Sequence, residues 1–154
     1  MKLKVTTTIF ASALALALIL LLSAGALPVS ASSERDGQLH VQKDCTGYTG
    51  NAGGHCPVTL SNLAEIPAGA HIFYDQAAGI PPGMLDSNII LDAGSGNRAV
   101  GRCTLDFSTG LGLCTFSDGT GHLAGFSARV NVSHLSGTLW AWEGTYSFSP
   151  ERDR

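Results

Sequence analysis

Two segments near the C-terminus alternate apolar and polar side chains with a period of two residues, the pattern of a β-strand. In residues 126–134 one face carries Phe126, Val130 and Val132, and serine, arginine and asparagine occupy the other. Residues 138–148 place aromatic side chains on one face, and the opposite face is also partly apolar. A strand with two partly apolar faces is typical of a closed barrel. Because no segment after residue 31 has a helical period, we expect an all-β protein.

Five further segments have strand-like sequences and are separated by short runs rich in glycine, proline, serine and asparagine. They cover residues 58–66, 70–76, 87–92, 98–107 and 111–117. Seven short strands predict a small barrel or sandwich, and the last strand favours an antiparallel β-barrel of seven or eight strands. We expect the barrel at residues 57–149, after an N-terminal arm at residues 32–56 and before a charged tail at residues 150–154.

The first 31 residues have the composition of an export signal. Lys2 and Lys4 precede an apolar run at residues 9–22, and small residues at 29–31 match the positions that signal peptidase recognises. We expect residues 1–31 to be a signal peptide that is cleaved after Ala31. The alternative is an uncleaved membrane anchor, because the uncharged stretch at residues 5–33 is long enough to cross a bilayer. In both cases we expect a secreted or periplasmic protein whose only membrane contact is this segment.

The four cysteines form two equally spaced pairs, Cys45 with Cys56 and Cys103 with Cys114. An even number of cysteines in an exported chain indicates disulfides. If residues 108 and 109 form a two-residue loop, Cys103 and Cys114 lie directly opposite each other, at the separation that a cross-strand disulfide needs. We therefore expect Cys103–Cys114, and Cys45–Cys56 pinning the arm. Zinc bound by four thiolates is the alternative, but neither pair has the short spacing of a zinc knuckle.

The composition of the exported part excludes several protein classes. Residues 32–154 carry 12 acidic and 7 basic side chains and 18 glycines. This composition excludes a basic nucleic-acid-binding protein, a collagen, a coiled coil and a polytopic membrane protein. No His-x-His, His-Glu-x-x-His or Gly-x-Ser-x-Gly pattern occurs. We expect no metal, no cofactor and no nucleic-acid partner.

Four charged side chains are candidates for catalysis, and each has a plain structural alternative. Arg102 and Asp106 share the strand face opposite the predicted disulfide, where they either line a cavity or form an exposed pair. Asp75 and Glu143 lie on other predicted strands. Burial among apolar residues would suit either carboxyl group to general acid catalysis, whereas a position outside the barrel would not.

The aromatic face of the last predicted strand suggests a binding site. Its four aromatic residues either fill the core or form the wall of an apolar ligand pocket; they are Trp140, Trp142, Tyr146 and Phe148. An enzyme built on such a pocket needs a cavity of a few hundred Å³ with ionisable groups inside. A barrel filled by these side chains would leave a structural role.

The C-terminal half of the chain resembles a known superfamily. The similarity lies in Gly-Arg-Cys-Thr-Leu at 101–105, Leu-Cys-Thr-Phe at 113–116, the glycine-rich run at 117–126 and Trp-Glu-Gly-Thr-Tyr at 142–146. These segments are similar to the allene oxide cyclase and dirigent-like barrel superfamily. The resemblance implies an eight-stranded antiparallel barrel with an apolar cavity, able to form a homo-oligomer, that steers cyclisation or coupling of small hydrophobic molecules. Ser117 and Asp118 stand where the family tends to have glycines, and no catalytic residue of the family is carried over.

Two functional hypotheses follow. In the first, the chain is a secreted β-barrel that binds a small hydrophobic ligand or has a structural extracytoplasmic role. The alternative is a cofactor-free isomerase similar to allene oxide cyclase, or a dirigent-like coupling protein, in which Asp75 or Glu143 assists the reaction.

Overall fold

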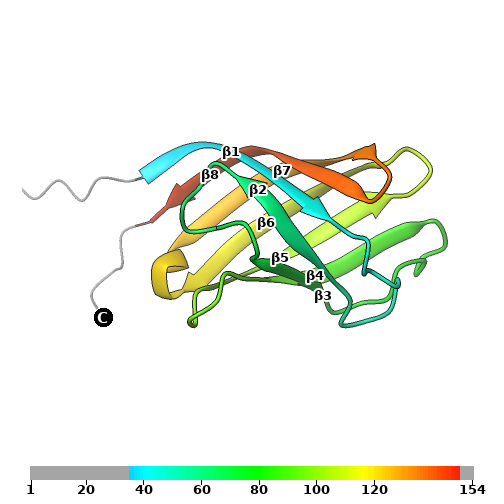
Figure 1. The fold of residues 1–154 in the computed structure, drawn as a ribbon, viewed down its shortest axis with the longest axis horizontal. Coiled ribbons are helices and arrows are strands. Elements are labelled where there is room, and N and C mark those ends of the chain that lie inside the picture. The colour runs from blue at the N-terminus through cyan, green and yellow to red at the C-terminus, as the bar shows by residue number, and fades with distance from the viewer. Residues whose placement is uncertain (1–34, 150–154) are drawn as a thin grey trace, which may run out of the picture. The chain divides into compact units, whose positions relative to one another are not determined.

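The protein is a closed antiparallel β-barrel of eight strands, in which each strand pairs with its neighbours in the chain and the last strand pairs with the first (Figure 1). The computed structural model describes residues 35–149, so the predicted signal peptide and the predicted charged tail lie outside the described residues. The strands are β1 (Arg35–Asp44), β2 (His55–Ser61), β3 (His71–Tyr74), β4 (Met84–Asp92), β5 (Arg98–Asp106), β6 (Leu111–Thr120), β7 (Phe126–Ser136) and β8 (Leu139–Phe148). The prediction of a small all-β barrel is confirmed.

Strand β1 corrects the predicted boundary of the barrel. Residues 35–44, expected to belong to a solvated arm, pair with β8 along their whole length and with β2 on the other side. Leu39, Val41 and Lys43 are the buried positions of this strand. Because Lys43 is charged, it interrupts the apolar alternation in the sequence, and the sequence therefore does not predict this strand. The barrel therefore begins at Arg35 and not at residue 57.

Aromatic side chains pack inside the barrel, from the end where β8 finishes, at Phe148, toward Trp142. Phe126 is completely buried, and the centroid of its ring lies 5.7 Å from that of Phe116 and 5.3 Å from that of Phe148. The ring of Phe116 in turn lies 5.5 Å from that of Trp142. Such tilted aromatic pairs add to the stabilisation from burial of apolar surface.

The two ends of the barrel are closed by different kinds of side chain. At the end where β8 finishes, on the left of Figure 1, the β2–β3 connection contributes buried Leu63 and Ile66. The short 3-10 turn η1 (Gly121–Leu123), which follows β6 within the glycine-rich run, adds buried Leu123. At the opposite end the chain buries Lys43. One end is thus apolar, and the other encloses a charged group.

Both disulfides have the predicted pairing. Cys103 and Cys114 are directly paired positions of β5 and β6, with Cα atoms 4.1 Å apart, and both are buried. Cys45–Cys56 links the residue after β1 to β2, with Cα atoms 4.5 Å apart. Each disulfide closes a short loop and contributes roughly 2 to 3 kcal/mol in the chain-entropy model.

Within residues 35–149, no helix is long and apolar enough to span a membrane.

Candidate functional site

Arg102 and Asp106 lie on the outer surface of β5 and are bonded to other residues. The Arg102 guanidinium donates hydrogen bonds to Asp86 at 2.7 Å and to Asn88 at 3.3 Å. Asp106 accepts hydrogen bonds from the hydroxyl and the backbone N–H of Ser108, at 2.6 and 2.7 Å, which lower the pKa of its carboxyl group. The two side chains form an exposed network and a turn, and neither lines an internal cavity.

Asp75 and Glu143 are exposed as well. Asp75 accepts hydrogen bonds from Ser87 at 3.1 Å and from Asn88 at 3.0 Å. The carboxyl group of Glu143 is hydrogen-bonded to Nδ1 of His40, the residue opposite it on β1. Both carboxyl groups therefore lie on the exposed surface of the protein and not among buried apolar side chains, which is the position that does not suit the predicted role in general acid catalysis.

The four aromatic side chains of β8 do not line one pocket. Trp142 and Phe148 are buried in the core, at 1% and 7% exposure. Tyr146 lies against Gly37 of β1, and the Trp140 ring packs on His134 with centroids 4.7 Å apart. Because β8 runs from one end of the barrel to the other, its aromatic residues are distributed along the barrel.

Lys43 is the charged residue that the barrel encloses. Only 4% of it is exposed, its Nζ donates a hydrogen bond to the Tyr74 hydroxyl at 2.5 Å, and Nζ lies 4.4 Å from the centroid of the Trp142 ring. No carboxylate of residues 35–149 forms an ion pair with it. Burial without a counterion lowers the pKa of Lys43 to about 7. The amine is therefore partly neutral at physiological pH.

Sequence reasoning missed this residue, although a signal existed. The chain has three lysines, and Lys2 and Lys4 lie in the leader, so Lys43 is the single lysine of residues 32–154. It follows Leu39 and Val41 at the next inward position of the same alternation. A lysine at such a position is a candidate for a buried amine, because lysine is almost never fully buried without a partner.

A cavity of about 40 Å³ adjoins Lys43 at the end of the barrel where the Cys45–Cys56 disulfide lies. Its wall is mainly apolar and is formed by Lys43, Cys45, Tyr48, Cys56, Tyr74, Leu85, Leu105, Phe107 and Trp140. The volume accommodates a few heavy atoms. It is far below the few hundred Å³ expected of a barrel that encloses a whole hydrophobic substrate.

Two donor groups around Lys43 have no hydrogen-bond partner. Among the described residues, three buried side-chain polar atoms are unpaired, and two of them are the Tyr48 hydroxyl and Trp142 Nε1. The Tyr48 ring lies 5.2 Å from that of Tyr74, and both rings line the cavity. Burial raises the pKa of Tyr48 and Tyr74, so both hydroxyls stay protonated at neutral pH. An unpaired buried hydroxyl lowers the stability of a folded protein by roughly 1 to 3 kcal/mol, so its presence in the native structure needs an explanation.

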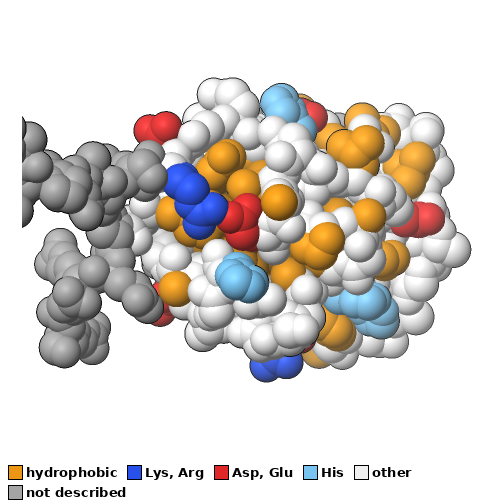
Figure 2. All heavy atoms as spheres, turned by 60° about the vertical axis from the view of Figure 1, so that its left-hand side comes forward, with side chains coloured by type: hydrophobic (Ala, Val, Ile, Leu, Met, Phe, Trp, Pro, Cys, Tyr) orange, Lys and Arg blue, Asp and Glu red, His pale blue; other side chains and the backbone are white. Residues whose placement is uncertain are grey.

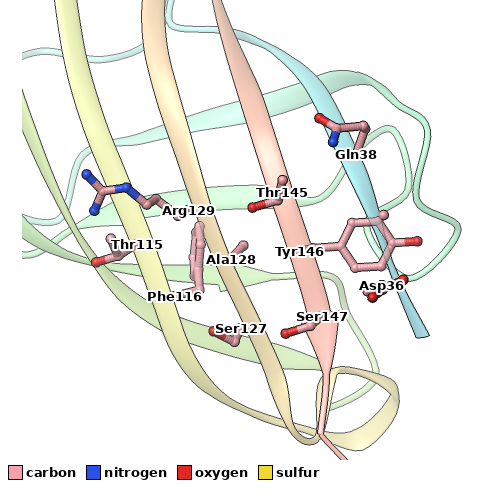
Figure 3. Close-up of a pocket in the computed structure, with 11 residues that line it drawn as sticks. Asp36, Gln38, Thr115, Phe116, Ser127, Ala128, Arg129, Thr145, Tyr146 and Ser147 are labelled. Carbon is pink, nitrogen blue, oxygen red and sulfur yellow. The ribbon is translucent and has the colours of Figure 1, made fainter. Parts of the chain in front are cut away.

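A larger hollow, of about 640 Å³, lies on the outer surface of β1, β8, β7 and β6 (Figure 3). Neighbouring positions on these strands form a polar row across it, consisting of Gln38, Thr145, Arg129 and Thr115. Asp36, Ser127 and Ser147 form a second row beside it. The groove is open and hydroxyl-rich, so a hydrophobic ligand there would remain in contact with water.

The rest of the described surface carries few charged side chains. On the face drawn in Figure 2 they lie between hydrophobic side chains, and blue and red side chains touch at one place. The rings of His55 and His71 lie 5.0 Å apart and pack with Phe73. Within residues 35–149, no group of three or more His, Cys, Asp or Glu side chains is arranged to hold a metal ion.

Comparison of the chain with family models, with curated proteins and with solved structures finds no match.

Proposed function

We propose that this chain is an exported β-barrel that binds a small, mainly apolar molecule with one oxygen atom in the cavity beside Lys43. The observation that carries the proposal is the Tyr48 hydroxyl, which is buried in the cavity wall without a hydrogen-bond partner in the described chain. An oxygen atom of a ligand would accept a hydrogen bond from this hydroxyl. The apolar part would contact the leucine and aromatic side chains of the same wall.

The position of the cavity supports entry of a ligand from solvent. Phe107, in the turn after β5, is 42% exposed and also lines the cavity, as does half-buried Trp140. An exposed aromatic side chain beside a small apolar cavity provides a surface for the part of a ligand that the cavity does not enclose. We therefore expect a short chain or ring whose polar end enters first.

Export is supported by two observations. The two disulfides are typical of proteins that mature in an oxidising compartment, and residues 1–31 have the composition of a signal peptide. We accordingly propose a secreted or periplasmic location, where the barrel would meet small molecules outside the cell.

Kinship with the allene oxide cyclase and dirigent-like superfamily is also our proposal, supported by the closed barrel of eight antiparallel strands. We favour binding over a cyclase-like reaction. The cavity of about 40 Å³ is too small to fold an extended substrate, and the carboxyl groups of Asp75 and Glu143 lie outside the barrel.

The test is a titration of the full chain with the n-alkanols from methanol to hexanol, followed by ¹H–¹⁵N NMR. We expect shifts at Lys43, Tyr48 and Phe107, with affinity rising about fourfold per added methylene, from ~0.8 kcal/mol each, until the cavity is full. Tyr48→Phe should weaken binding by roughly two- to tenfold, the value of one neutral hydrogen bond. Tyr146→Phe, which changes a tyrosine outside the cavity, should leave the affinity unchanged. Shifts spread evenly over the barrel, or confined to the outer groove, would refute the proposal.

A further inference from the structure

We infer that the ligand is a small aldehyde or ketone, which Lys43 captures as an imine, since Lys43 and Tyr48, whose buried hydroxyl is unpaired, line the same apolar cavity. This inference rests on the proposed function and names the chemical class of the ligand. In this inference the Lys43 amine bonds to the carbonyl carbon, and the hydroxyl of Tyr48, a residue of the same cavity wall, donates a hydrogen bond to the carbonyl oxygen.

The surroundings of Lys43 suit a nucleophilic amine. No carboxylate of the described residues pairs with it, and its neighbours are the Tyr74 hydroxyl and the face of the Trp142 ring. A lysine in an apolar site loses its proton more easily than one in water and becomes nucleophilic. The lowered pKa of about 7 agrees with this environment. Tyr48 and Tyr74, both protonated at neutral pH, are the other titratable groups of the cavity wall.

The reaction that we infer is a condensation without redox change. The lone pair of the neutral Lys43 amine forms a bond to the carbonyl carbon, and the C=O π electrons move to the oxygen. A proton then passes from nitrogen to that oxygen, which gives a carbinolamine. Loss of the oxygen as water, with the second amine proton, leaves the C=N bond. The Tyr48 hydroxyl donates a hydrogen bond to the oxygen while its negative charge develops.

The same surroundings suit the product. Protonation of the imine gives a cation at the position of Nζ, which lies 4.4 Å from the centroid of the Trp142 ring. The face of an aromatic ring attracts such a cation. The small cavity also limits access of the water that would hydrolyse the C=N bond.

The test is reductive trapping of the full chain with propionaldehyde and cyanoborohydride at pH 7, followed by peptide mapping. The reagent delivers hydride to the imine carbon and makes the bond permanent. We expect Lys43 to be propylated at least about tenfold faster in the native protein than in the same chain unfolded in urea, where its pKa is that of an ordinary lysine. A buried lysine without this function would be protected by folding. Labelling of native Lys43 at the unfolded rate or more slowly would therefore overturn the inference.

Two variants distinguish labelling that depends on the Tyr48 hydroxyl from labelling that depends only on the access of the reagent to Lys43. Tyr48→Phe should slow labelling of Lys43 several-fold, and the matched Tyr146→Phe should not; equal rates for the two would overturn the role of Tyr48. Circular dichroism and intact disulfides would show that both variants are folded. Binding of n-alkanols without any trapped imine would overturn this inference and leave the proposed function standing. Absence of both would refute both.

Discussion

The Nζ atom of Lys43 on β1 lies 2.5 Å from the hydroxyl oxygen of Tyr74 on β3, so one hydrogen bond spans β2 inside the barrel. Exclusion of water acts on the two groups in opposite directions. It lowers the pKa of Lys43 to about 7 and raises that of Tyr74. In both cases burial favours the uncharged form, because a charge is costly in a site without a counterion.

The first prediction concerns pH and stability. Between pH 7 and 10 the unfolded chain holds a proton on Lys43 that the folded protein has released, so stability should rise with pH by up to about 1.4 kcal/mol per unit. Above pH 10 the trend should reverse, because unfolded Tyr74 ionises and the folded residue, with its raised pKa, does not. Urea unfolding at a series of pH values measures both limbs. Lys43→Met should abolish the rising limb, and a flat profile of the unaltered chain would contradict the burial of this amine.

The second prediction is that Tyr48→Phe stabilises the protein. The Tyr48 hydroxyl is buried without a partner, so its removal should raise the free energy of unfolding by about 1 kcal/mol. The midpoint of urea unfolding would show the gain, and Tyr146→Phe serves as the control. A variant that is more stable and binds alkanols less tightly would show that the hydroxyl is retained for binding. A loss of stability would mean that the hydroxyl has a partner in solution.

The third prediction concerns the close approach of β7 and β8. A Cβ atom at Gly144 would lie 2.0 Å from the backbone oxygen of Arg129, whereas a Cβ atom at Gly47 would meet no atom within 4 Å. Gly144→Ala should therefore destabilise the barrel by about 3 kcal/mol, because backbone has to move, and Gly47→Ala should have little effect. Thermal unfolding of the two variants compares them directly. Equal stability would show that the two strands separate without cost at this point.

The fourth prediction concerns the order in which the disulfides are reduced. Cys103 and Cys114 are both buried, at 2% and 0% exposure, whereas Cys45 is partly exposed. Because a thiolate must reach a sulfur atom to attack it, dithiothreitol under native conditions should reduce Cys45–Cys56 first. Cys103–Cys114 should resist until the barrel unfolds. Alkylation and mass spectrometry at successive times would reveal the order, and simultaneous loss of both bonds would contradict it.

The fifth prediction tests the external carboxyl groups. Glu143→Gln removes the charge from an exposed side-chain contact with His40 and should change stability by less than about 1 kcal/mol. Binding of n-alkanols should be unchanged, because Glu143 does not line the cavity. NMR titration of this variant provides the measurement. A marked loss of affinity for n-alkanols would contradict this prediction and show that Glu143 contributes to binding.

The sequence by itself determined the local features of the fold. Alternation with a period of two residues predicted β7 and β8, because side chains of a strand point to opposite faces in turn. The short loop between β5 and β6 placed Cys103 opposite Cys114, since a tight turn sets the register of a hairpin. Both features depend on residues that are close together in the chain.

The tertiary structure decided which face of each strand is inside and what meets there. Closure of the barrel pairs β1 with β8, from opposite ends of the described chain. Because of this pairing, residues 35–44, which were predicted to be an arm, form a strand of the barrel. It also buries Lys43 beside Tyr74 and Trp142, while Glu143, one residue from Trp142, faces water. The alternation of Leu39, Val41 and Lys43 marks the lysine as a candidate for burial, but no local pattern could predict the cavity beside it, because the wall of the cavity is formed by strands that are distant in sequence.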